Sequence, residues 1–129
     1  MDPISDMLIR MKNAQAVGKK TASFGYSKIK WEIAKLLEKH NYLTEVAKKG
    51  KKNKKLLEVA FVYDADGTPK ISDVKRISKL SRRIYRGFRE IYPVRHGFGV
   101  AVYSTTKGLL TDKEARKEKL GGEVLFELY

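Results

Sequence analysis

The chain has 129 residues, of which 42% are hydrophobic and 33% charged, enough for one ordinary domain or two small lobes with a core. It contains no cysteine, which excludes a disulfide scaffold, a zinc ribbon and a cysteine nucleophile. Its 28 lysines and arginines oppose 15 acidic residues. The resulting net charge of +13 indicates a polyanionic partner, nucleic acid first and an anionic membrane surface second. We expect neither a signal peptide nor a membrane span from the sequence.

The first 40 residues predict two helices with a short strand between them. Asp2 can cap a helix whose first turn holds Pro3 and which ends near Gly18. Its apolar positions follow helical spacing: Ile4, Met7, Leu8 and Met11. A strand is expected around 21–26, followed by a helix capped by Ser27. The predicted core stripe of this second helix is Ile29, Ile33, Leu36 and Leu37.

The period then changes to that of strands. Segments 42–47 and 56–63 are rich in β-branched and aromatic residues and predict two strands. Segment 64–69 is a strong turn signal, so we expect an N-terminal α/β lobe over 1–66 and a β-rich lobe over 67–129.

The second half predicts short strands at 71–77, 82–85, 100–103 and 123–129. Thr111 and Glu114 have the spacing of a capping box and predict a short helix through about Lys117. The fold class is therefore α+β.

Two basic segments leave alternatives open. The run 48–55 holds six lysines in eight residues, including Lys51, Lys52, Lys54 and Lys55. It is either a solvated hairpin tip or a loop that binds phosphates without sequence preference. Segment 70–95 holds nine basic residues with Tyr85, Phe88 and Tyr92 among them. Either these aromatic residues stack on unpaired bases, or Ile84, Tyr85 and Ile91 are only core residues of a basic sheet.

The sharpest local signal is the segment Ser104-Thr105-Thr106-Lys107-Gly108, which follows an apolar strand. Hydroxyl groups both donate and accept hydrogen bonds, so a rigid turn of them can recognise base edges and 2′-hydroxyls. The segment also matches the S-x-x-K pattern of some serine hydrolases, but the partner motifs are absent and the chain is too short for that fold. Two histidines and no cysteine also argue against an RNA-processing enzyme.

These motifs together resemble the bacterial-type small-subunit ribosomal protein eight (S-eight) family over almost the whole chain. The resemblance rests on the segments 2–10 with Asn13, 27–30, 83–85, 104–112 and 121–123. It implies an N-terminal lobe of two helices and a three-stranded sheet, and a mainly antiparallel β C-terminal lobe with one short helix. Trp31 and the lysine run depart from the family pattern.

The resemblance also implies a function: a non-enzymatic, cytoplasmic structural protein of the small ribosomal subunit, required for subunit assembly and translation. Its expected partners are the central domain of 16S ribosomal RNA and neighbouring ribosomal proteins. Whether it also binds its own operon messenger RNA, as family members can, stays open. In the family, the turn at Ser104, Thr105, Thr106 and Lys107 enters an RNA minor groove, Tyr85 and Glu123 lie near it, and Lys30 matches a basic position of the first lobe. No cofactor or metal is expected. The remaining expected RNA-binding residues are Gly108, Arg83, Arg86, Lys28, Arg10, Asn13 and the four lysines named above.

Overall fold

A computed structural model describes residues 2–50, 54–79 and 81–129. The chain forms two compact units, Pro3–Ser72 and Asp73–Tyr129, here called the N-terminal and C-terminal units. The boundary predicted from the turn signal lies earlier, between residues 66 and 67. Each unit combines helix with antiparallel sheet, which confirms the α+β class.

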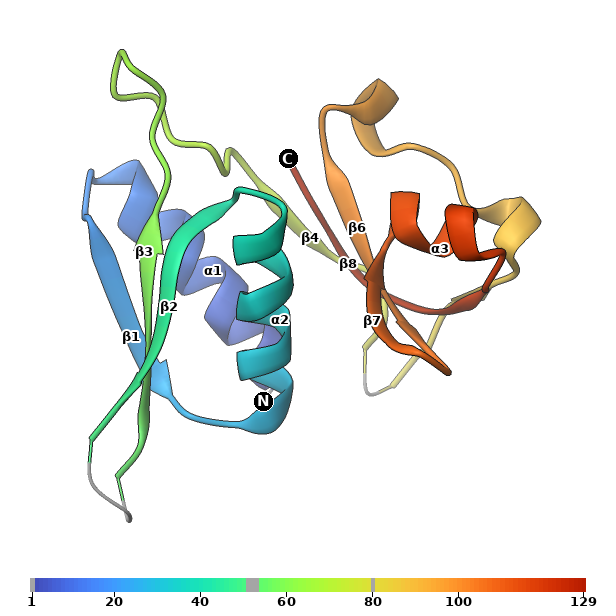
Figure 1. Cartoon of the computed structure of the whole chain (residues 1–129), viewed down its shortest axis with the longest axis horizontal. Coiled ribbons are helices and arrows are strands. Elements are labelled where there is room, and N and C mark those ends of the chain that lie inside the picture. Colours follow the sequence, from blue (N-terminus) through green and yellow to red (C-terminus); the bar gives the residue numbers. More distant parts are fainter. Residues whose placement is uncertain (1, 51–53, 80) are drawn as a thin grey trace. The chain divides into compact units, whose positions relative to one another are not determined.

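The N-terminal unit consists of two helices and a three-stranded antiparallel sheet, as predicted (Figure 1). Its elements are α1 (Pro3–Ala16), β1 (Thr21–Gly25), α2 (Lys28–Lys39), β2 (Leu43–Lys49) and β3 (Leu56–Phe61). The strand order is β1-β3-β2, so β3 is central and β1 is an edge strand. Ser27 caps α2 by accepting a hydrogen bond from the Lys30 amide at 3.3 Å, which satisfies one of the helix's unpaired donors.

The core of this unit lies between the helices and one face of the sheet. Met7, Leu8 and Met11 of α1 are buried, as are Ile33, Ala34, Leu36 and Leu37 of α2. The predicted stripe on α2 was wrong at Ile29, which is only partly buried in the first turn, while Ala34 is fully buried. The methyl side chain of Ala34 lets α2 approach the sheet closely. The predicted stripe contained only large apolar residues and therefore left this position out.

The C-terminal unit is an antiparallel sheet with one short helix, also as predicted. Its strands are β4 (Val74–Arg76), β5 (Tyr85–Arg86), β6 (Val100–Thr105), β7 (Gly108–Thr111) and β8 (Gly122–Leu128), and its helix is α3 (Asp112–Glu118). The order is β4-β8-β6-β7, and β5 also pairs with β8. Two short 3-10 turns, η1 (Phe88–Glu90) and η2 (Val94–Gly97), lie between β5 and β6 in the chain.

Strand lengths in this unit differ from the prediction. The segments expected as strands over 71–77 and 82–85 contribute only β4 and β5, because a turn intervenes in which Lys79 and Arg82 exchange backbone hydrogen bonds. β7 was not predicted, since Gly-Leu-Leu-Thr shows no alternation of apolar and polar residues. Within the described residues, no helix is long and apolar enough to cross a membrane.

Candidate nucleic-acid interface

A rigid hairpin turn ends the buried strand β6. Val100, Ala101, Val102 and Tyr103 are buried, and the chain then emerges at Ser104. Ser104 pairs with Leu109 and Thr105 with Gly108, which leaves Thr106 and Lys107 as the two-residue loop. Gly108 has a φ of +94°, a conformation that favours glycine. We call residues Ser104–Gly108 the Ser104 turn.

The three hydroxyls of the Ser104 turn have different tasks. The Thr105 hydroxyl donates to the Gly108 carbonyl at 2.8 Å and accepts from the Lys107 amide at 3.1 Å, so it holds the loop closed. Ser104 and Thr106 are exposed, and within the described part of the chain their hydroxyls have no hydrogen-bond partner. Two hydroxyls are therefore presented to solvent on a turn that the third one fixes.

Strand register brings three distant residues into one row across the sheet. Glu123 of β8 pairs with Tyr85 of β5 on one side and with Ser104 of β6 on the other. Directly opposite residues in a sheet project from the same face. Tyr85, Glu123 and Ser104 therefore share a face, as the resemblance implied, and Tyr85 is 66% exposed there.

Glycine permits the close approach of β8 to the turn. A Cβ at Gly122 would lie 2.2 Å from the Ser104 carbonyl oxygen, and a Cβ at Gly121 would lie 2.5 Å from the Arg86 carbonyl oxygen. Neither distance is compatible with a side chain unless backbone moves. The row of Tyr85, Glu123 and Ser104 thus depends on small residues at the start of β8.

Helix α3 supports the other end of the turn. The predicted capping box is confirmed, because the Thr111 hydroxyl accepts from the Glu114 amide at 3.2 Å and the Glu114 carboxylate accepts from the Thr111 amide at 3.1 Å. Lys107 Nζ lies 3.2 Å from the Glu118 carboxylate on the same helix. This exposed pair orients the lysine but contributes little to stability.

Arg83 lies beside the row, whereas Arg86 projects from the opposite face of the sheet, because successive residues of a strand alternate between faces. Arg83 Nη1 lies 3.3 Å from both carboxylate oxygens of Glu123. The Arg86 guanidinium lies 4.9 Å from the ring centre of Tyr92, which is 52% exposed. Ile91 is buried in the core of the unit and Ile84 packs against it. The core alternative is therefore correct for the isoleucines, whereas Tyr85, Phe88 and Tyr92 are surface residues.

Arg86 contacts the core on the opposite face of the sheet from the row, because its Nη1 donates to the buried Tyr103 hydroxyl at 3.2 Å. Burial disfavours the phenolate and raises the pKa of Tyr103, with Arg86 opposing that effect in part. The folded protein therefore keeps this proton to a higher pH than the unfolded chain, whose tyrosines titrate near 10.0. Folding stability should fall as the pH rises above that value.

Urea unfolding at pH values below and above 10.0 tests this expectation. The wild type should lose more stability across that interval than Tyr103→Phe, which has no phenol at this position. Tyr63 in the N-terminal unit also has a pKa raised by burial, so it lowers the folding stability of both proteins at high pH. Equal losses in the two proteins would show that Tyr103 does not titrate with unfolding.

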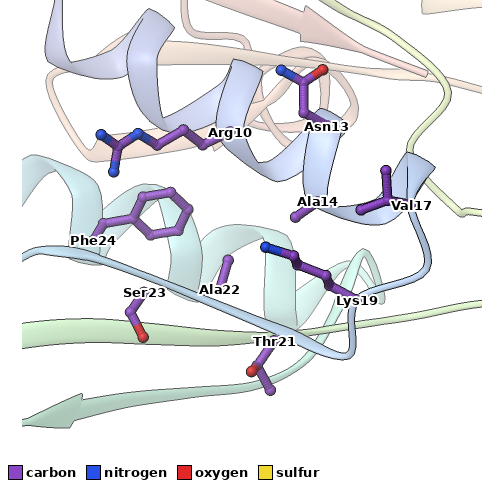
Figure 2. Close-up of a pocket in the computed structure, with 9 residues that line it drawn as sticks. All are labelled: Arg10, Asn13, Ala14, Val17, Lys19, Thr21, Ala22, Ser23 and Phe24. Carbon is purple, nitrogen blue, oxygen red and sulfur yellow. The ribbon is translucent and has the colours of Figure 1, made fainter.

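The expected basic residues of the N-terminal unit lie at several places within it. Lys28 is exposed at the start of α2, and Lys30 Nζ donates to the Gly25 carbonyl at 3.3 Å. Lys54 and Lys55 are exposed before β3, whereas Lys51 and Lys52 lie outside the described residues. Arg10 and Asn13 lie on α1 and line a groove beside β1 (Figure 2).

The sequence analysis gave no role to Trp31. Its ring lies 6.4 Å from that of Tyr26, and Lys48 Nζ lies 4.7 Å from the Trp31 centroid and 4.9 Å from that of Tyr26. Cation–π contact therefore fixes the base of the lysine-rich hairpin against α2. Local sequence could not show this, because Lys48 and Trp31 meet only once β2 is paired.

The Ser104 turn and the row beside it give the C-terminal unit an exposed surface of hydroxyl, tyrosine, lysine and arginine side chains. In the described ranges, no group of three or more histidine, aspartate or glutamate side chains could hold a metal ion. The family described as Ribosomal protein S8 matches residues 2–129.

Three relatives are each described as small ribosomal subunit protein uS8. The protein from Persephonella marina is 46% identical over 129 residues, covering 96% of this chain and 95% of its own. Those from Thiobacillus denitrificans and Xanthomonas axonopodis pv. citri are 44% and 45% identical, each covering 96% of this chain and 94% of their own. The chain belongs to the ribosomal protein S8 family, and it is a structural ribosomal protein rather than an enzyme.

Proposed function

We propose that this protein assembles into the small ribosomal subunit, as the names of its relatives say of them, and binds the central domain of 16S ribosomal RNA. The observation that carries the proposal is the row of Tyr85, Glu123 and Ser104 beside a turn with two hydroxyls that have no hydrogen-bond partner among the described residues. The net charge of +13 supports a polyanionic ligand.

Recognition by this surface has two components. Ser104 and Thr106 donate to and accept from base edges and 2′-hydroxyls in the shallow minor groove of RNA. Lys107 and Arg83 contact phosphates, and Tyr85 offers a ring face for an unpaired base. Arg86, on the opposite face of the sheet, contacts phosphate there. Because the turn is already ordered by Thr105, binding loses little conformational entropy.

The basic residues of the N-terminal unit add affinity without sequence preference. Lys28, Lys54 and Lys55 are exposed lysines, and lysine contacts phosphate as a point charge. Each phosphate neutralised should contribute about −0.7 to −0.9 to the slope of log affinity against log salt. Lys51 and Lys52 are proposed to contribute in the same way.

Ser104→Ala tests the proposed recognition. The substitution removes one exposed oxygen and should change folding stability by about 0.5 kcal/mol or less. The bound RNA would keep a polar group facing the lost partner, so affinity for the central-domain junction should fall by about 1–3 kcal/mol. Titrations of the junction and of an unstructured RNA, with a thermal melt, measure these effects.

The matched control is Lys54→Ala combined with Lys55→Ala. This double variant should lower the affinity for both RNAs about equally, whereas Ser104→Ala should lower only the affinity for the junction. An equal effect of Ser104→Ala on both RNAs, or no effect on either, would remove the Ser104 turn from the proposed interface.

A further inference from the structure

The edge strand β1 leaves a row of backbone groups without a strand partner among the described residues. Residues 21–25 of β1 pair with residues 60–56 of β3. Two flanking hydrogen bonds show which residues of β1 bond to β3. The Phe61 amide donates to the Lys20 carbonyl at 3.0 Å, and the Tyr26 amide donates to the Lys55 carbonyl at 3.1 Å. Ala22 and Phe24 therefore bond to β3, and the amides and carbonyls of Thr21, Ser23 and Gly25 point to the open edge.

Helix α1 stands beside this edge and forms a groove with it (Figure 2). The groove has a volume of about 470 Å³. Thr21–Phe24 form one wall, and Arg10, Asn13 and Ala14 of α1 form the other together with Val17, which directly follows the helix. An exposed strand edge beside a groove is the geometry in which an extended peptide can add to a sheet.

The side chains of the groove specify the chemistry of its occupant. Phe24, Ala14, Ala22 and Val17 give it an apolar lining, and Val17 is 73% exposed. Arg10 and Lys19 make it cationic, and Figure 2 shows the Lys19 amine extending across it. The ion pair of Arg10 with Asp6 uses Nε, at 3.3 Å, and arginine carries five N–H donors in all.

The backbone edge favours polypeptide over RNA. It presents carbonyl acceptors alternating with amide donors, which an extended peptide satisfies in pairs. Phosphate oxygens only accept, so a sugar-phosphate chain could pair through its phosphates with the Thr21 and Ser23 amides but not with the carbonyls that alternate with them. At the far end, Lys30 Nζ already occupies the Gly25 carbonyl at 3.3 Å, which limits the addition to the Thr21–Ser23 part of the edge.

We propose that the groove between α1 and β1 binds an extended segment of a neighbouring ribosomal protein, which adds as a strand to β1 and places a carboxylate between Arg10 and Lys19. Small apolar side chains of that segment alternate into the groove. Arg10 and Asn13 are then peptide-binding residues rather than RNA-binding ones. The inference rests on assembly into the small subunit but not on the RNA contacts of the Ser104 turn.

Cross-linking in purified small subunits tests it, with the photoreactive p-benzoylphenylalanine in place of Val17. The expected product is a cross-link to a carboxylate-bearing segment of another ribosomal protein, located by mass spectrometry. Ser23→Pro removes the outward amide without breaking the ladder to β3, because proline is tolerated at such edge positions. The yield should fall about threefold to tenfold, as expected for one lost hydrogen bond.

Ser23→Ala is the matched control, because it keeps the amide and should leave the yield unchanged. If Ser23→Pro lowers the melting temperature, Lys19→Glu replaces it, and the yield should fall through repulsion of the carboxylate. A cross-link to ribosomal RNA, a yield equal in all variants, or no cross-link in subunits that contain the protein would overturn the inference. Failure to enter the subunit would instead contradict the proposed function.

Discussion

Gly122→Ala should destabilise the C-terminal unit by about 3 kcal/mol, the upper part of the range for overpacking. The new Cβ would lie 2.2 Å from the Ser104 carbonyl oxygen and 3.0 Å from its carbonyl carbon. Both are backbone atoms, so no side chain can rotate away to relieve the contact. The strands β6 and β8 must separate at the point where Ser104 pairs with Glu123.

The same displacement should also weaken RNA binding, because it moves Ser104 out of its row with Glu123 and Tyr85. Affinity for the central-domain junction should therefore fall at least about tenfold, even below the melting temperature, as a misplaced hydrogen bond to a polar partner implies. Urea unfolding and RNA titration measure the two effects. Gly25→Ala is the control, since its Cβ would meet no atom within 4 Å. Equal stability of the two variants would show that β8 does not need a glycine here.

Asp112→Ala should destabilise the same unit by about 3–4 kcal/mol. Asp112 is fully buried at the start of α3, where its Oδ1 accepts from the Ala101 amide at 3.2 Å and its Oδ2 lies 3.3 Å from Arg116 Nη1. β7 ends at Thr111, so this carboxylate takes the place of a strand partner for Ala101. Alanine would leave a buried amide and a partly buried guanidinium unpaired.

Asp112→Asn separates these contributions. Its amide oxygen can still accept from Ala101, so only the charge opposite Arg116 and the helix N-terminus is lost, and the destabilisation should be about half as large. Denaturant unfolding compares the two variants. If asparagine proved as destabilising as alanine, the hydrogen bond to Ala101 would not be what holds α3 to β6.

Local signals in the sequence were sufficient where the structure depends on neighbours along the chain. The Ser27 cap and the Thr111–Glu114 capping box both form as predicted, because each joins residues three apart. The two helices and three strands of the N-terminal unit follow from periodicity in the same way.

Features set by strand register could not be predicted from the residues alone. The row of Tyr85, Glu123 and Ser104 requires β5 and β6 to flank β8, and it also depends on a register shift in the β6–β8 ladder near Tyr103. No local pattern encodes that shift, and the family resemblance alone placed these residues together. The groove beside β1 likewise appears only once β3 has paired with one side of that strand.

Directed hydroxyl-radical probing tests the central claim most directly. The natural chain has no cysteine, so Lys117→Cys on α3, next to the Glu118 that pairs with Lys107, gives a single site for an iron–EDTA tether. In reconstituted small subunits, the tethered protein should cleave 16S ribosomal RNA at one junction of the central domain, and the cysteine-free protein treated with the same reagent should cleave nothing. Cleavage confined to another domain, or none from a protein bound in the subunit, would contradict the account.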